Sequence, residues 1–247
     1  MAKLRGGTYD PRTRITDSEI PEPQAPSLTP AEAELLARTA GIGTSTWSDA
    51  LDSLGIAGVV QGLSRRSGEG RIAGFAATAR HACGELGGFE RADFAVGRLI
   101  AATAPGRVLV VDMGGANIST FGGLAAMAAR RRNATGVIID GGCRDIEEIR
   151  GSGLWLASRW VTPTTGKTRV RLESLGGQVA VGGVTVREGD LVVADDTGIV
   201  VVPRADLPRV LEQAERILEV DLAVERDLRA GKSFGEAAAA ADYIPER

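Results

Sequence analysis

The chain has 247 residues, of which 43% are hydrophobic and 25% are charged, and its formal net charge is −3 at pH 7. This balance is ordinary for a soluble globular protein and predicts no broad basic surface for nucleic acid. The sequence contains no apolar stretch of about 18 residues, so we expect no membrane span, and a cytoplasmic location is expected because residues 1–30 lack the apolar centre of a signal peptide.

The residue types present exclude several kinds of site. His81 is the only histidine, and Cys83 and Cys143 are the only cysteines, so one chain cannot provide the ligands of the common zinc sites. Lysine-dependent covalent catalysis is disfavoured, because Lys167 is predicted in a turn before a strand and the other lysines lie in segments that look peripheral. Any metal is therefore expected to be a hard cation with oxygen ligands.

The first two thirds of the chain alternate between strand and helix patterns. Residues 1–28 are rich in proline and lack periodicity, which predicts an extended arm. The alternation of strand and helix patterns predicts a parallel sheet with helical crossovers. In chain order, helices are predicted at 29–41 and 45–54, a strand at 71–80, a helix at 90–104, a strand at 108–111, a helix at 122–132, a strand at 136–139 and a helix at 145–150.

The last third has a different pattern. Short apolar strands are separated by turns that contain glycine, which predicts a compact antiparallel layer, and a long helix follows at 207–228. We expect one mixed α/β domain with two β layers and one helical layer. Its parts are an arm at 1–28, a central domain at 29–206, and C-terminal helices with a tail at 207–247. The short strands are predicted at 169–172, 179–181, 184–186, 191–193 and 199–202.

Polar residues and glycines follow two of the predicted parallel strands. One strand ends at Asp112 and leads through a glycine-rich segment to a helix that begins at Gly122. The next strand is followed by the segment 140–145, which ends in Arg144 and Asp145. Ligands of open α/β sheets bind outside the carboxyl ends of the strands, so this is the predicted site.

The start of the helix at 122–132 is predicted to bind an anion. Its first amides, at Gly122, Gly123, Leu124 and Ala125, have no partners within the helix and carry a partial positive charge. The guanidinium group of Arg144 binds a carboxylate through two parallel hydrogen bonds. A carboxylate or phosphate ligand is expected here.

Two carboxylates are the candidate metal ligands. Asp145 begins a predicted helix and is expected to hold Mg2+ or Mn2+ directly or through water. Glu148, one turn later, faces the same side, and two such carboxylates repel each other unless a cation or a proton lies between them. The plainer interpretation is that Arg144 and Asp145 only cap a helix.

Plainer roles also exist for three other polar residues. Asp112 is a candidate for holding the glycine-rich segment in place. Cys143 has no histidine nearby in the sequence to activate it and is expected to be a small packing residue. His81 is more often structural than catalytic at such a position, and the arginine runs at 65–66 and 130–132 are interpreted as solvated surface.

These motifs resemble the family of the regulator of ribonuclease E activity A, which also contains the class II 4-hydroxy-4-methyl-2-oxoglutarate aldolases. The resemblance covers roughly residues 40–215 and is most specific in the segment from Asp112 to Pro163. Supporting motifs are found at 48–55 and 189–198. The resemblance implies a three-layer β/β/α fold of the swivelling-domain type, assembled as homotrimers or homohexamers with active sites near subunit interfaces.

The resemblance also implies roles for the site residues. It implies that amides at Gly122 to Ala125 hold the carboxylate of a pyruvyl group, that Arg144 contacts the substrate, and that Asp145 binds Mg2+ or Mn2+, partly through water. The aldolases usually carry an aspartate at the position of Gly123. The arrangement here, Gly123 with Arg144, Asp145 and Glu148, resembles regulator-like members, some of which decarboxylate oxaloacetate, so Glu148 is expected to replace the missing carboxylate.

The resulting hypothesis is a metal-dependent lyase that cleaves a carbon–carbon bond of a small 2-oxo acid through the enolate of pyruvate, with Arg144 and Asp145 as catalytic residues. It would act as an oxaloacetate decarboxylase or as a 4-hydroxy-2-oxo acid aldolase. One alternative is a non-catalytic trimeric regulator that binds a ribonuclease or helicase. Another is a methyltransferase, because residues 108–115 form a strand and a glycine loop, although their spacing is not Gly-x-Gly-x-x-Gly.

Overall fold

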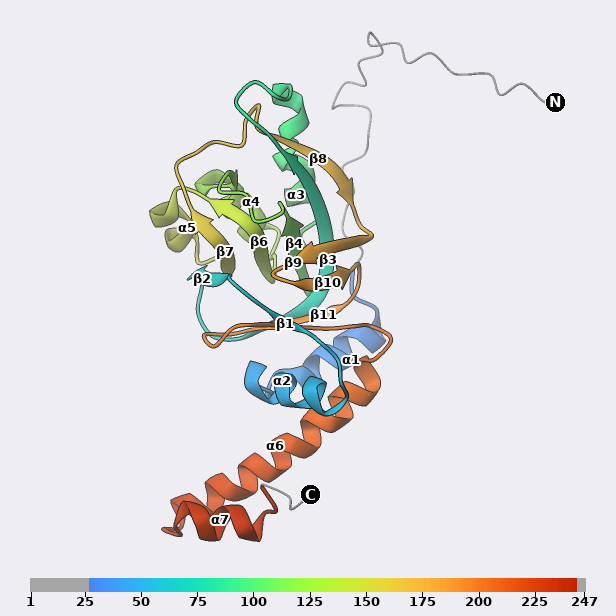
Figure 1. Cartoon of the computed structure of the whole chain (residues 1–247), viewed down its shortest axis with the longest axis vertical. Helices are drawn as coiled ribbons and strands as arrows, with labels where there is room; N and C mark the ends of the chain where they lie inside the picture. The colour runs from blue at the N-terminus through green and yellow to red at the C-terminus, as the bar shows by residue number, and fades with distance from the viewer. Residues whose placement is uncertain (1–26, 244–247) are drawn as a thin grey trace, which may run out of the picture.

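The computed structural model describes residues 27–243, and a mixed sheet runs through the body of the molecule (Figure 1). The predicted arm at 1–28 lies outside the described residues, apart from its last two. The strand order is β1-β12-β11-β3-β4-β6-β7-β2, with β5 paired to β6 and β8 paired to β3. The strands of this sheet are β1 (Val59–Val60), β2 (Ser64–Ser67), β3 (Ile72–Cys83), β4 (Arg107–Asp112), β5 (Ser119–Phe121), β6 (Gly136–Cys143), β7 (Leu156–Val161), β8 (Val170–Leu175), β11 (Leu191–Ala194) and β12 (Ile199–Val202).

The helices and a separate hairpin surround this sheet. Strands β9 (Gln178–Val181) and β10 (Val184–Arg187) pair with each other in antiparallel fashion. The helices between residues 27 and 243 do not combine the length and apolar character that a membrane crossing requires. They are α1 (Pro30–Thr39), α2 (Thr44–Ser53), a 3-10 helix (Arg91–Phe94), α3 (Val96–Ala101), α4 (Gly123–Arg131), α5 (Ile146–Ser152), α6 (Leu207–Arg229) and α7 (Phe234–Ala240).

The predicted parallel centre with helical crossovers is confirmed. Strands β3, β4, β6 and β7 are parallel neighbours, and α3, α4 and α5 occur in the connections between them. Alternate residues of β4 point to opposite faces of the sheet. Leu109 and Val111 join the buried cluster that includes residues of α3, α4 and α5, whereas Val108 and Val110 join a cluster with the β9–β10 hairpin. The order of layers is therefore hairpin, sheet and helices, as the β/β/α prediction required.

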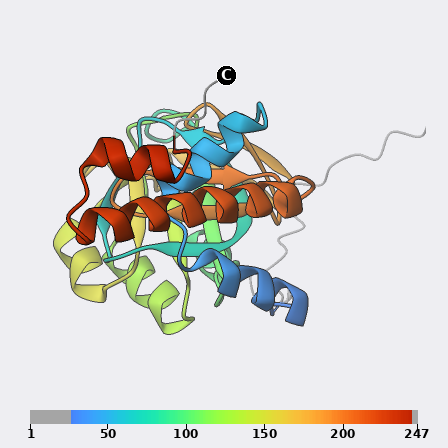
Figure 2. The ribbon, with the colours of Figure 1, turned by 90° about the horizontal axis from the view of Figure 1, so that it is seen from below.

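Helices α2 and α6 lie at the other end of the molecule. Trp47 and Leu51 of α2 pack with Val210 and Leu211 of α6 in a third buried cluster, which also contains residues of β11 and β12. Figure 2 shows α6 running across this end with α7 folded back beside it. The predicted long helix thus covers the antiparallel side of the sheet, while the carboxyl ends of the parallel strands remain clear of it.

The predicted helix at 90–104 is wrong, because it is broken at Ala95. Ala95 adopts left-handed backbone angles (φ 41°, ψ 35°), which separate a 3-10 helix from α3. In the first segment the Glu90 amide donates a hydrogen bond to the Asp93 side chain, which closes a single turn. An alanine in this conformation is uncommon, so the apolar periodicity gives no sign of the break.

The predicted glycine turn after Asp140 is also wrong, because β6 continues through it to Cys143. The two glycines are required by close packing within the sheet. A Cβ at Gly141 would lie 2.4 Å from Sδ of Met113, and one at Gly142 would lie 2.8 Å from the carbonyl oxygen of Ile118. Glycine in a strand can mark such a close approach as well as a turn.

Candidate active site

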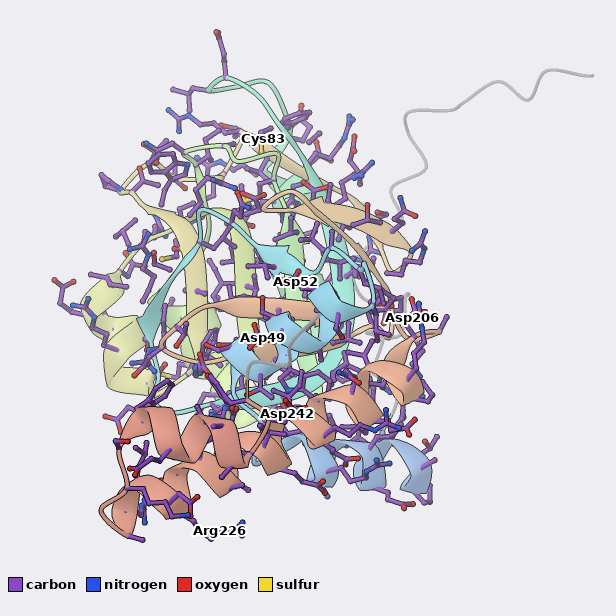
Figure 3. All side chains as sticks on the ribbon, turned by 60° about the horizontal axis from the view of Figure 1, so that its bottom comes forward. Asp49, Asp52, Cys83, Asp206, Arg226 and Asp242 are labelled. Atoms are coloured by element: carbon purple, nitrogen blue, oxygen red, sulfur yellow. The ribbon has the colours of Figure 1, made fainter. Side chains whose placement is uncertain are left out.

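A cavity of about 220 Å³ opens where β5 and β6 end and α4 begins. The strand β3 also ends at this edge of the sheet, where Figure 3 labels Cys83. Asp206, at the start of α6, and Arg226, within α6, lie away from this edge. The cavity brings together most of the predicted site residues. It is lined by Phe94, Val96, Ser119, Thr120, Phe121, Gly122, Leu124, Ala125, Arg144, Asp145, Thr165 and Lys167.

Asp145 connects the end of β6 to the start of α4. It caps α5 with left-handed backbone angles (φ 54°, ψ 51°), a conformation that aspartate tolerates better than most residues. Its Oδ2 accepts a hydrogen bond from the Gly123 amide at 3.2 Å and lies 3.4 Å from Nε of Arg144. Both charged side chains are more than one third exposed, at 37% for Arg144 and 41% for Asp145. The pair is therefore accessible to a ligand in the cavity.

The four amides that were predicted to bind an anion are not equally available in the structure. The Gly123 amide donates to Asp145, so its donor is already used. The amides of Leu124 and Ala125 donate to no acceptor within residues 27–243, and both residues line the cavity. They are the unpaired donors of the first turn of α4, where the helix dipole favours a negative charge. The Gly122 carbonyl accepts from Ala126, which closes that turn.

Two glycines let α4 and α5 approach each other closely. A Cβ at Gly122 would lie 2.5 Å from Oδ2 of Asp145, and a Cβ at Gly123 would lie 2.6 Å from Cβ of Glu148. Gly123 and Glu148 do not line the cavity themselves but lie directly beside Asp145. The space that a side chain at position 123 requires is therefore filled by Glu148.

The donor set suits a hard, hydrated cation. Within residues 27–243, no cluster of three or more His, Cys, Asp or Glu side chains is arranged to hold a metal ion. Asp145 and Glu148 supply two neighbouring carboxylates, both exposed to solvent. Mg2+ is commonly held by one or two carboxylates and keeps several water ligands, whereas structural zinc needs four protein ligands. The residues present thus fit Mg2+ or Mn2+, with water completing the coordination.

Asp112 and Asp140 bind the β9–β10 hairpin and do not line the cavity. The two oxygens of Asp112 accept from the amides of Gly114 and Ala180, at 2.9 Å and 3.0 Å. Asp140 accepts from the Gly182 amide at 2.7 Å and pairs with Arg159. Both carboxylates therefore bind the β9–β10 hairpin to the sheet. The hydrogen bond from Gly114 confirms the plainer interpretation of Asp112, which is that it holds the glycine-rich segment in place.

The amides of both glycines in the loop after β4, and that of Ala116, already have acceptors. Gly114 donates to the Asp112 side chain, Gly115 to the Asp140 carbonyl and Ala116 to the Met113 carbonyl. A phosphate-binding loop needs free amides directed at its ligand. The loop glycines therefore offer no free amide to a phosphate, which argues against the methyltransferase hypothesis.

Four lining residues lie outside the two segments that were predicted to form the site, 112–125 and 140–145. Phe94 and Val96 come from the segment around the broken helix and form an apolar wall, and Thr165 and Lys167 come from the loop between β7 and β8. The turn at Lys167 was predicted, but its proximity to Arg144 was not. These residues are distant along the chain from the Arg-Asp motif, and only the folded sheet brings them together.

Cys143 and His81 are buried structural residues in this fold. Burial raises the pKa of the Cys143 thiol, whose sulfur lies 3.4 Å from Oγ of Ser158. Neither ring nitrogen of His81 has a hydrogen-bond partner within residues 27–243, and the residue is 6% exposed. Burial lowers the pKa of His81 from 6.5 to about 4, although the nearby Asp112 carboxylate acts in the opposite direction. Neither residue lines the cavity.

His81 should make the fold sensitive to mild acid. Below pH 6.5 the unfolded chain binds a proton that the buried ring does not bind until about pH 4, so acid favours unfolding. We expect the free energy of unfolding, measured in urea, to fall by about 2 kcal/mol between pH 8 and pH 5. The variant His81→Leu lacks the only histidine and should lose most of this fall. An equal fall in the variant would contradict the assignment.

Comparison with known proteins links this fold to a described family. A family model described as RraA-like, aldolase/RraA, matches residues 44–201, which include β5, β6, α4 and α5. A solved structure, Streptomyces coelicolor RraAS2, superposes with a TM-score of 0.64 at 26% identity, over 77% of this chain and 92% of that one. It is described as an unusual member of the RNase ES inhibitor RraA protein family.

Two curated relatives add sequence similarity. An uncharacterised protein of Methanocaldococcus jannaschii is 35% identical over 121 residues, which are 49% of this chain and 58% of that protein. The chain therefore matches less than two thirds of that relative's length. A protein of Halalkalibacterium halodurans, provisionally named a 4-hydroxy-4-methyl-2-oxoglutarate aldolase, is 26% identical over 200 residues, or 81% of this chain and 90% of its own.

Proposed function

Because the chain belongs to the RraA-like family, we propose that it is a divalent-metal-dependent lyase that cleaves a carbon–carbon bond of a small 2-oxo acid. The family includes relatives named as aldolases and structures described as ribonuclease inhibitors. The proposed reaction is oxaloacetate decarboxylation or cleavage of a 4-hydroxy-2-oxo acid, and both release pyruvate.

One observation carries the proposal: unpaired helix amides, an accessible arginine and an accessible aspartate line the same small cavity. The amides of Leu124 and Ala125 and the guanidinium group of Arg144 can receive a carboxylate and an oxyanion. Asp145 accepts a hydrogen bond from the Gly123 amide and lies 3.4 Å from Nε of Arg144. A helix cap alone would not require that these groups converge on a cavity.

Backbone amides, Arg144 and the two carboxylates each bind a different group in this proposal. Leu124 and Ala125 bind the C1 carboxylate through their amides, and Arg144 donates to the oxygen at C2, where negative charge develops. Asp145 and Glu148 would hold Mg2+ or Mn2+, with water between carboxylate and metal where the distance requires it. When bound, that cation supplies Lewis acidity at the 2-oxo acid group. Phe94 and Val96 keep one side of the cavity apolar, which strengthens these charged contacts.

Both candidate reactions pass through the enolate of pyruvate. In oxaloacetate, the bond between C3 and the C4 carboxylate breaks, its electron pair moves into the C2 carbonyl, and CO2 leaves. In a 4-hydroxy-2-oxo acid, the C4 hydroxyl gives its proton to solvent water and its freed electron pair forms the carbonyl of the second product. The bond between C3 and C4 breaks, and its electron pair moves into the C2 carbonyl. A proton added at C3 then gives pyruvate in either case. Arg144 stabilises the oxyanion common to both reactions.

The proposal includes an assembly of three or six copies. Leu124, which lines the cavity, is 84% exposed, and Met127, one turn later on α4, is 56% exposed. Exposed large apolar side chains of this kind are common at protein interfaces. A second copy placed against α4 would shield the cavity from water.

Pyruvate release from a panel of oxo acids tests the proposed function. Purified protein with Mg2+ or Mn2+ should release pyruvate from oxaloacetate or from 4-hydroxy-4-methyl-2-oxoglutarate above the spontaneous rate, and a chelator should abolish this release. Release that is equally fast with chelator would contradict the proposed mechanism.

The alternative is a non-catalytic trimeric regulator that binds a ribonuclease or helicase. It is supported by the description of the Streptomyces coelicolor neighbour as a member of an RNase ES inhibitor family. The same assay separates the two functions. A protein that releases no pyruvate from any acid in the panel, but inhibits a ribonuclease on direct mixing, would support the regulator.

A further inference from the structure

The cavity is lined by a second positively charged side chain, that of Lys167, which the proposed mechanism does not use. Lys167 lines it, together with Arg144 and Asp145, the other charged residues of the lining. The Lys167 ammonium group makes no hydrogen bond or ion pair with any residue between 27 and 243. Arg144, by contrast, has Asp145 within 3.4 Å. The lining thus carries one more positive charge than negative charge.

The backbone around Lys167 is held firmly against β5. The Ser119 amide donates to the Thr164 carbonyl at 2.9 Å, and the Lys167 amide donates to Oγ1 of Thr165 at 3.2 Å. Gly166 is packed so closely that a Cβ there would lie 2.5 Å from the Ser119 carbonyl oxygen and 2.6 Å from the Phe94 ring. The lysine therefore extends from a fixed position beside the cavity, which lowers the entropic cost of binding a ligand.

We propose that Lys167 is a specificity-determining residue that binds a carboxylate at the distal end of the substrate, on the C4 side. This inference rests on the proposed function, in which the helix amides and Arg144 already bind the C1 carboxylate and the C2 oxygen. An ammonium group without a partner is suited to a second anionic group. A 2-oxo acid with one carboxylate would leave this cation unpaired.

Lys167 should also influence which reaction is faster. In the aldol substrate the distal carboxylate keeps its charge throughout cleavage, so its ion pair with Lys167 persists in the transition state. In oxaloacetate the same carboxylate leaves as neutral CO2, so the ion pair stabilises the ground state more than the transition state. An interaction that is stronger in the ground state does not accelerate the chemical step. Lys167 therefore favours aldol cleavage over decarboxylation.

Kinetics of the variant Lys167→Gln test this inference. We expect KM for 4-hydroxy-4-methyl-2-oxoglutarate, which has two carboxylates, to rise about 10- to 100-fold, the effect of losing one charged hydrogen bond. For 4-hydroxy-2-oxopentanoate, which has one carboxylate, KM should stay within about twofold. A change of that size is well below the binding free energy of one charged hydrogen bond. For oxaloacetate, KM should rise while kcat stays equal or increases. Lys167→Arg should retain the discrimination in part, and Lys232→Gln, which removes a lysine paired with Asp227 on the surface, should change nothing.

The outcomes separate this inference from the proposed function. If the unaltered protein releases pyruvate but Lys167→Gln changes KM equally for acids with one and two carboxylates, Lys167 is not the distal contact and the proposed function survives. If kcat for oxaloacetate falls as much as kcat/KM for the aldol substrate, the effect on reaction choice is wrong. If the unaltered protein turns over none of the acids, both proposals fail together. An unchanged urea midpoint establishes that the variant is folded.

Discussion

Replacing Asp145 with asparagine should reduce pyruvate release by at least about 10³-fold, the scale of losing an electrostatic centre that stabilises the transition state. The substitution keeps the size of the side chain, and its amide oxygen can still accept the hydrogen bond from Gly123. It removes the negative charge that would hold the cation and leaves Arg144 without its partner. The expected defect is therefore in kcat with saturating substrate and metal.

Glu147→Gln is the matched control for this substitution. Glu147 lies in the first turn of the same helix, α5, and is exposed, but it neither lines the cavity nor contacts Gly122 or Gly123. Its loss should leave kcat within about twofold, as expected for a surface charge far from any specific contact. Equal loss of activity in both variants would show that charge at the start of α5, rather than Asp145 itself, supports the reaction.

A carboxylate at position 123 should be able to replace the carboxylate at position 148, and exchanging the two residues tests this. Gly123→Asp alone places a Cβ about 2.6 Å from Cβ of Glu148, and this contact cannot be relieved by a flexible side-chain end. We expect a loss of stability of about 1–3 kcal/mol and lower activity. Glu148→Gly alone removes the carboxylate, with an expected loss of about 10- to 100-fold in activity.

The double variant Gly123→Asp, Glu148→Gly removes the contact and restores a carboxylate. Its activity should exceed the product of the two single effects by at least about 10-fold, a coupling typical of residues in direct contact. Glycine in α5 costs about 1 kcal/mol of stability, so activity and urea unfolding must be measured on each variant. Glu148→Ala, which retains the Cβ, separates loss of the carboxylate from the effect of glycine. Independent effects would contradict a shared role.

Much of the fold follows from local patterns in the sequence. Buried strands such as β4 and β12 are continuous apolar runs, and α1 begins at a proline behind a capping threonine, whose side chain accepts from the Glu32 amide. Strand β5 has only three residues, and β7 contains Arg159 and Trp160, so neither has a clear strand pattern. The left-handed alanine that ends the 3-10 helix has no signal in the sequence at all.

The site was only partly predictable, for a related reason. Arg144 and Asp145 follow a recognisable strand, and strand ends are where α/β proteins bind ligands. Asp112 and Asp140 occupy equivalent places in the pattern, yet their oxygens accept from amides of the hairpin or its connections. Only the fold distinguishes a carboxylate held by such amides from one beside a cavity. Lys167 and Phe94 were missed because their proximity to Arg144 depends on contacts between distant segments.

The most direct test of a metal-dependent enolate site does not require knowledge of the natural substrate. A protein that stabilises the enolate of pyruvate should also catalyse exchange of the pyruvate methyl protons with solvent. In D2O with Mg2+, proton NMR should show loss of the methyl signal with the unaltered protein and no loss above the blank with chelator or with Asp145→Asn. Exchange that persists equally under all three conditions, or that fails with Mg2+ in a protein that releases pyruvate from oxo acids, would contradict the account.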